Sequence, residues 1–133
     1  MSAPVPRVGC GAAIVRDGRL LLVKRLRPPE AGSWSLPGGK VEFGERLVEA
    51  VAREIREEIG VAIALERLLG VVEMVGLDDQ HWVSPIYLAT IVAGEPCVCE
   101  PTKHEDIAWF SLGKPPAPLS AAARDAFAAL AGG

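Results

Sequence analysis

The sequence predicts an α/β fold in which a mixed β-sheet lies between helices. Three features of the 133 residues lead to this prediction. Short segments rich in Val, Ile and Leu alternate with turn residues, one central segment has helical periodicity, and the end of the chain is rich in alanine. Strands, a helix, further strands and a final helix in that order are typical of a sheet covered by helices. The length suits one domain, expected to span residues 1–133.

The first two strands are expected over residues 8–15 and 20–23, two apolar runs that flank Asp17-Gly18. An Asp-Gly pair in this setting is typical of a tight β-hairpin. Residues 27–33 contain two prolines and a glycine, so we expect a loop there. Leu36-Pro37-Gly38-Gly39 is a second break, because glycine adopts positive φ without steric cost.

The central segment, residues 45–59, is expected to be a helix. Apolar residues recur there at steps of three and four, which predicts one buried stripe made of Val48, Val51, Ile55 and Ile59. Gly60 follows at the position where helices commonly end with glycine.

The second half of the chain predicts two longer strands, residues 61–75 and 82–92, around a turn at Asp78-Asp79. A short strand is expected over residues 107–110. Ser120 is positioned to cap a last helix that carries Phe127 and Leu130.

Composition excludes several classes of protein. The net charge of −3 lacks the basic footprint of a nucleic-acid binder. No apolar run is long enough to cross a bilayer, and residues 1–7 lack the apolar core of a signal peptide. Cys10, Cys97 and Cys99 are an odd number of cysteines, which we interpret as reduced thiols. We therefore expect a cytoplasmic protein without a membrane partner.

Three glutamates carry the clearest chemical signal. Glu54, Glu57 and Glu58 stand at i, i+3 and i+4, so they share one helix face beside the apolar stripe. Like charges this close repel each other, and a hard cation such as Mg²⁺ would offset that repulsion. A solvated acidic surface is the competing interpretation for such a triplet on its own.

Two neighbours support the cation interpretation. Arg53 lies four residues before Glu57, so its guanidinium is in reach to pair with that carboxylate and orient it. Gly38-Gly39 precedes the helix, and a glycine carbonyl approaches a metal without a side chain in the way.

These residues match a known motif as a set. Gly39, five residues, Glu45, seven residues and then the run from Arg53 to Val61 resemble the Nudix box at every defined position. The lead-in from Leu36 to Gly39 resembles the family as well. The resemblance implies the Nudix α/β/α sandwich, and hydrolysis of a phosphoanhydride bond in a nucleoside-diphosphate-linked compound.

The resemblance also implies a role for each residue of the motif. Glu54, Glu57 and Glu58 would hold Mg²⁺, with Mn²⁺ as an alternative ion, and Gly39 would add its carbonyl oxygen. Arg53 would orient the glutamates, and Glu45 would be structural or an outer ligand. A metal-activated water would then attack phosphorus.

A further acidic residue often comes from a later loop in this family. Glu105, four residues before Trp109, is the candidate for a base or an extra ligand, and Glu100 is the second choice. An exposed loop carboxylate is the competing interpretation of Glu105. The expected catalytic set is thus Glu57, Arg53 and Glu105.

The region after the box bears on the substrate. Residues 94–96, 100–105 and 109–110 resemble the MutT-like branch, which implies cleavage of a nucleoside triphosphate to the monophosphate and pyrophosphate. The ADP-ribose branch usually carries a proline soon after the box, whereas residues 61–84 contain none.

Contacts with the substrate are expected from side chains outside the box. Arg25, Arg27 and Lys103 are the candidates for binding phosphates, with a plain surface role as the alternative. Aromatic side chains are available to stack on a base or to pack in the core, namely Trp34, Trp82 and Phe110.

Two other classes of function stay open at this point. One is hydrolysis of ADP-ribose, another nucleoside-diphosphate compound or a pterin triphosphate, and the other is a non-catalytic Nudix-like binding module. The intact set of carboxylates argues against a binding module. The expected partner is a small nucleotide rather than a nucleic acid, and a homodimer is suggested by several members of the family.

Overall fold

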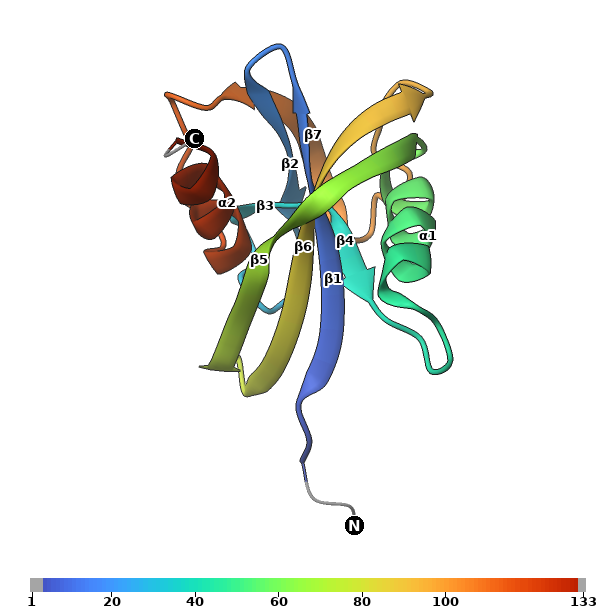
Figure 1. Ribbon diagram of the computed structural model, residues 1–133. Helices are drawn as coiled ribbons and strands as arrows, with labels where there is room; N and C mark the ends of the chain where they lie inside the picture. The colour runs from blue at the N-terminus through green and yellow to red at the C-terminus, as the bar shows by residue number, and fades with distance from the viewer. Residues whose placement is uncertain (1–3, 132–133) are drawn as a thin grey trace.

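The computed structural model describes residues 4–131, so residues 1–3 and 132–133 of the predicted domain lie outside it. A mixed sheet lies between α1 on one face and α2 on the other (Figure 1), which confirms the predicted α/β class. The elements in chain order are β1 (Arg7–Arg16), β2 (Arg19–Arg25), β3 (Trp34–Ser35), β4 (Gly38–Lys40), α1 (Leu47–Ile59), β5 (Ala62–Leu77), β6 (Gln80–Ala93), β7 (His104–Ser111) and α2 (Ala121–Ala131).

The sheet has seven strands, and β1 connects its two halves. The main path runs β3-β2-β1-β6-β5, with β4 paired to β1 and β7 paired to β2. The β1–β6 pair is parallel, whereas the other pairs are antiparallel. Residues 9–11 of β1 pair with β4, and residues 15–16 pair with β2. The first part of β1 therefore lies between β4 and β6 in the sheet.

Several predicted elements are confirmed, with boundaries that differ by a few residues from those expected. Asp17 and Gly18 both have positive φ, 53° and 71°, as a tight hairpin turn requires. The predicted helix begins two residues later than expected, and Gly60 ends it with φ of 74°. Strands β3 and β4 were not predicted, because segments of two or three residues carry no readable periodicity.

Two apolar cores fill the space between the sheet and the helices. Leu21 and Val23 of β2 face the core under α1, while Leu20 and Leu22 face the core under α2. Alternate side chains of a strand point to opposite faces, so a continuous apolar run serves both cores.

The prediction that Val48 is buried is wrong. Its side chain is exposed, and Ala50 lies in the buried stripe with Val51, Ile55 and Ile59. The same buried face also carries two of the glutamates. The final helix is confirmed, with the Ser120 hydroxyl accepting a hydrogen bond from Ala123 N at 3.1 Å and Phe127 buried. Within residues 4–131 no helix has the length and apolar character needed to span a membrane.

Candidate active site

The three glutamates of α1 differ sharply in exposure. Glu54 and Glu58 are only 6% and 5% exposed, whereas the Glu57 side chain is 51% exposed. One turn of helix separates Glu54 from Glu58, so both lie on the face that α1 turns towards β1 and β4. A buried carboxylate is costly unless it is paired or neutralised, which marks this face as more than a solvated acidic surface.

Arg53 connects the glutamates to one another. Its Nε and Nη2 donate to the two Glu45 oxygens at 2.6 and 2.8 Å. Its Nη1 donates to Glu54 at 2.9 Å and to Glu57 at 3.2 Å, and Nη2 also donates to the Lys40 carbonyl at 3.0 Å. The predicted pair with Glu57 is therefore present, and the bidentate pair with Glu45 holds the guanidinium in place.

Glu58 is turned away from Arg53. Its Oε1 accepts a hydrogen bond from Gly38 N at 2.7 Å, and its Oε2 lies 3.6 Å from His104 Nε2. Burial raises the pKa of Glu58 to about 8, and the negative charges of Glu54 and Glu100 add to the rise. Burial, together with the nearby Arg25 charge, lowers the pKa of His104 to about 4. Both shifts favour the uncharged form of the group concerned, so this contact is a weak polar contact rather than a strong ion pair.

Strand β4 supplies backbone rather than side chains to this site. Gly39 pairs with Cys10 of β1, and the Glu54 carboxylate lies against its α-carbon so closely that a β-carbon would overlap it. A β-carbon on Gly38 would likewise overlap the Cys10 carbonyl. The glycine pair is thus required by close packing, whereas positive φ, which the sequence suggested, is not observed at either residue.

A cleft of about 190 Å³ borders β4, and Gly38 and Gly39, which the α1 glutamates contact, are among the residues that line it. Gly9 and Gly11 of β1 form part of its wall, where a β-carbon on Gly9 would stand 2.5 Å from Ser84 Oγ. Met74 and Trp82 from the β5–β6 hairpin line the other side. Small residues on β1 therefore keep the cleft open beside Gly38 and Gly39.

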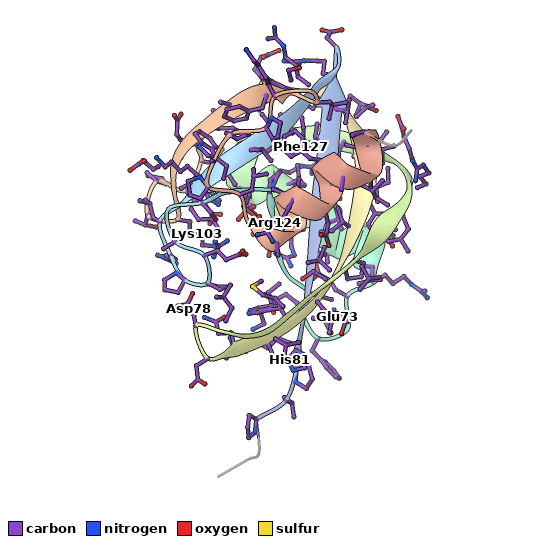
Figure 2. The ribbon with its side chains drawn as sticks, turned by 90° about the vertical axis from the view of Figure 1, so that its left-hand side faces the viewer. Glu73, Asp78, His81, Lys103, Arg124 and Phe127 are labelled. Atoms are coloured by element: carbon purple, nitrogen blue, oxygen red, sulfur yellow. The ribbon has the colours of Figure 1, made fainter. Side chains whose placement is uncertain are left out.

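Glu30, in the loop before β3, also lines the cleft, although the sequence did not single it out. Its backbone N–H donates to Asp78 Oδ2 at 3.2 Å, and its Oε2 accepts from Ala121 N at 2.8 Å. Glu30 thus joins the start of α2 to the tip of the β5–β6 hairpin, where Figure 2 shows Asp78 and His81. Glu30 has a positive φ of 63°, and the only sequence signal for an unusual loop here was its composition, with Pro28, Pro29 and Gly32.

The three residues expected to bind phosphates differ in their location relative to the cleft. Arg25 lines the cleft, with Nε donating to the Pro29 carbonyl at 2.8 Å. Lys103 pairs with Glu100 at 3.3 Å, and its charge acts on Glu58. Arg27 is exposed and does not line the cleft.

The aromatic candidates are also separated. Trp82 lines the cleft and donates from Nε1 to the Gln80 side chain at 2.7 Å. Trp34 and Phe110 instead meet edge to face, with ring centroids 4.8 Å apart, against the core under α2. Of the three, Trp82 alone borders the cleft.

Glu105 does not lie where we expected it. It is the extra residue at an irregularity between β2 and β7, and it pairs with Lys24 at 3.3 Å. The Lys24 ammonium lies over Trp34, which packs against the core under α2, whereas the helix glutamates lie on the α1 side. Glu100, the second choice, is the carboxylate whose charge acts on Glu58, and its Oε1 is buried without a hydrogen-bond partner.

The types of side chain at this site suit a divalent cation, but the side chains do not point towards a common centre. Among residues 4–131, no three His, Cys, Asp or Glu side chains converge as a ready metal site. Glu54 and Glu57 are turned to Arg53, and Glu58 is turned to Gly38. The unpaired Glu100 oxygen and the buried Glu58 carboxyl, whose pKa is raised by burial and by nearby negative charges, nevertheless fit a site for positive charge, and oxygen ligands of this kind suit a hard cation.

Comparison with known proteins identifies the family. The family model described as NUDIX domain matches residues 5–130. The chain therefore belongs to the NUDIX domain family of hydrolases, whose members generally use divalent metal ions.

The chain is also similar to individual proteins, two of which are named for different substrates. A crystal structure of a MutT NUDIX hydrolase from Burkholderia pseudomallei is 55% identical with a TM-score of 0.88, covering 96% of this chain and 99% of that chain. An ADP-ribose pyrophosphatase from Methanocaldococcus jannaschii is 40% identical over 68% of this chain, which spans 54% of that relative. A putative 8-oxo-dGTP diphosphatase 2 from Mycobacterium tuberculosis is 40% identical over 77% of this chain and 71% of its own length.

Proposed function

We propose that this protein is a divalent-metal-dependent pyrophosphohydrolase that splits a nucleoside triphosphate into the monophosphate and pyrophosphate. The observation that carries the proposal is the juxtaposition of two buried glutamates, Glu54 and Glu58, with the glycine strand that borders the cleft. A substrate in the cleft would thus present its phosphates next to the carboxylates that hold the metal.

The residues that would hold the cation are Glu54, Glu57 and Glu58, with the carbonyl of Gly39. Bound there, a divalent ion lowers the pKa of its water and offsets charge on the phosphoryl oxygens. Arg53 keeps Glu54 and Glu57 together, since one of its nitrogens donates to both. Without the ion, the three carboxylates would repel the anionic substrate.

The cleft supports a nucleotide as the substrate. Trp82 and Met74 offer apolar surface for a base, and Arg25 offers a cation at the end where the phosphates would lie. Lys103, beside Glu100, is a second cation near Glu58. The triphosphate assignment draws on the MutT-like residues after the box and on the relative named as a putative 8-oxo-dGTP diphosphatase.

Hydrolysis of ADP-ribose is the second candidate. The observation in its favour is the Methanocaldococcus jannaschii relative, which is named an ADP-ribose pyrophosphatase and is 40% identical over 91 residues. The two candidates share the metal chemistry and differ in what lies beyond the cleaved bond.

A substrate panel tests the proposal. We expect turnover of a nucleoside triphosphate with release of pyrophosphate in Mg²⁺ or Mn²⁺, and loss of turnover when the metal is chelated. Glu57→Gln should lower kcat by about 10²-fold, the scale of removing a key electrostatic stabiliser. Glu66→Gln, which neutralises an exposed glutamate on β5, is the matched control.

Two results would contradict different parts of the proposal. Near-wild-type turnover of Glu57→Gln at saturating metal would overturn the role of the helix carboxylates. A far higher kcat/KM for ADP-ribose, with AMP and ribose 5-phosphate as products, would overturn the triphosphate assignment and leave the metal chemistry intact.

A further inference from the structure

Two cysteines lie side by side at the end of α1, outside the cleft. The Sγ atoms of Cys97 and Cys99 are 3.5 Å apart, and both side chains are exposed free thiols. Neither residue takes part in the proposed hydrolysis. Their exposure makes both thiols accessible to a disulfide reagent, unlike the buried Cys10, and the hydrogen bond between them raises the pKa of Cys99.

The backbone of this pair is bound to the helix that carries the glutamates. Cys97 N donates to the Ile59 carbonyl at 3.0 Å, and Cys99 N donates to the Glu58 carbonyl at 3.0 Å. These are carbonyls of the last turn of α1, which lack partners within the helix. The cysteine segment therefore completes the hydrogen bonding of the turn that holds Glu58.

The two sulfur atoms also cover the end of the helix. Gly60 has a left-handed conformation with φ of 74°, and a β-carbon there would lie 3.1 Å from Cys99 Sγ and 3.7 Å from Cys97 Sγ. The thiols thus pack over the Gly60 α-carbon, at the C-terminal end of α1.

We propose that Cys97 and Cys99 form a redox-active dithiol site that takes a small disulfide, such as oxidised glutathione, and closes to an intramolecular disulfide that weakens metal binding by α1. Closure needs the sulfurs to move from 3.5 Å to a bond of about 2.0 Å. The residues are two positions apart and exposed, so the segment can make this adjustment without breaking the core.

The reaction balances as two successive exchanges. The thiolate of one cysteine attacks the glutathione disulfide, forms a mixed disulfide and releases one glutathione thiolate. The second cysteine thiolate attacks the protein sulfur of the mixed disulfide, forms the Cys97–Cys99 bond and releases the second glutathione. The two protein thiols lose two protons and two electrons in total, and the glutathione disulfide is reduced to two thiols.

Closure would act on the metal site through Glu58. Drawing the sulfurs together over Gly60 changes the backbone between Cys97 and Cys99, and with it the hydrogen bond from Cys99 N to the Glu58 carbonyl. This step rests on the proposed function, in which Glu58 holds the cation. Changes in the groups that orient a metal ligand commonly cost 10–100-fold in metal affinity, and a shift of the backbone that carries Glu58 should lie at the lower end, so we expect about a tenfold weaker affinity in the oxidised protein.

The test uses the whole protein and two readouts that need no substrate. Wild type, Cys97→Ser and Cys99→Ser are treated with oxidised glutathione, and intact mass and peptide mapping identify the products. Mn²⁺ binding is then measured by calorimetry before oxidation, after oxidation and after reduction with dithiothreitol. We expect wild type to lose two hydrogens at Cys97 and Cys99 and to bind Mn²⁺ about tenfold more weakly until it is reduced.

The serine variants are the matched controls. Each should stop at a glutathione adduct on its remaining cysteine and keep the Mn²⁺ affinity of its untreated form. Stable adducts on both cysteines of wild type, or a disulfide to Cys10, would overturn the dithiol site. A closed disulfide with unchanged Mn²⁺ affinity would overturn its action on α1. Closure and weaker binding in a protein that hydrolyses no nucleotide would support the inference and contradict the proposed function instead.

Discussion

The carboxylate of Glu54 lies directly against the α-carbon of Gly39, on the strand that pairs with Cys10 of β1. No side chain fits between the helix and the strand at this point, because a β-carbon would overlap both carboxylate oxygens. The contact places a buried carboxylate directly against the backbone of Gly39. It also makes position 39 a sensitive test of the metal site.

Gly39→Ala should therefore displace the Glu54 carboxylate. We expect the concentration of Mg²⁺ needed for half-maximal activity to rise by about 10-fold or more, because a ligand and its neighbour are both disturbed. Gly70→Ala is the control, since a β-carbon on Gly70 meets nothing within 4 Å. An unchanged metal requirement in Gly39→Ala would show that the Glu54–Gly39 contact has no part in metal binding.

Arg53→Ala should lower kcat more than it raises KM. The guanidinium contacts Glu45, Glu54, Glu57 and the Lys40 carbonyl. Its loss should therefore disturb the orientation of the metal ligands, whereas no contact with the substrate is removed. An effect of about 10–100-fold on kcat is expected for such an orienting residue. Arg56→Ala, an exposed arginine on the same helix, is the control. A change confined to KM would instead identify Arg53 as a substrate contact.

Glu100→Gln and Glu105→Gln form a paired test of the additional acidic residue. Glu100 acts on Glu58, whereas Glu105 pairs with Lys24, whose ammonium lies over Trp34. We expect Glu100→Gln to lower kcat by about 10²-fold, as for loss of a general base, and Glu105→Gln to keep turnover close to wild type. The reverse pattern would support the assignment made from the sequence.

Stability at acid pH should depend on Glu45. The hydrogen bonds from Arg53 lower the pKa of Glu45 from 4.5 to about 2, so folding favours its charged form. The resulting stability is present above pH 4.5 and is lost as the pH falls towards 2. We expect Glu45→Gln to lower the Tm at pH 7, and the difference from wild type to shrink between pH 4.5 and 2. A difference that is constant with pH would contradict this account.

The three thiols should differ in reactivity. Cys10 is 5% exposed and burial raises its pKa to about 11, so it has little thiolate and little access at pH 8. Cys97 and Cys99 are exposed. A chromogenic disulfide reagent should titrate two thiols rapidly in the native protein and the third after unfolding in denaturant. Rapid reaction of all three thiols in the native wild type, or of the single remaining thiol in the native Cys97→Ser/Cys99→Ser double variant, would show that Cys10 is accessible.

Local signals in the sequence were sufficient for most of the elements. The Asp17-Gly18 hairpin, the end of α1 at Gly60 and the cap at Ser120 each depend on residues within a few positions of one another. Spacing along the helix likewise placed Glu54, Glu57 and Glu58 on one face and Arg53 within reach of Glu57. Such features follow from backbone geometry and need no knowledge of the packing.

Which side chains are buried, and on which face of the sheet they lie, depends on contacts between residues that are far apart in the sequence. Periodicity indicated Val48 as buried, but the packing of α1 on β1 and β4 buries Glu54 and Glu58 and leaves Val48 exposed. Pairing of β2 with β7 leaves Glu105 beside Lys24, on the opposite side of the sheet from α1. The short distance in sequence between Glu105 and Trp109 did not indicate on which side of the sheet Glu105 would lie.

The sequence by itself determined the chemical groups of the site, because the motif from Gly39 to Val61 fixes which residue types share a helix face and which glycines precede it. The tertiary structure alone decided that Glu58 is buried against Gly38, that Glu30 joins α2 to the β5–β6 hairpin, and that Cys97 and Cys99 meet over Gly60. Each of these contacts joins residues from separate elements. Their geometry follows from how the strands pair and how the helices pack, which no local pattern specifies.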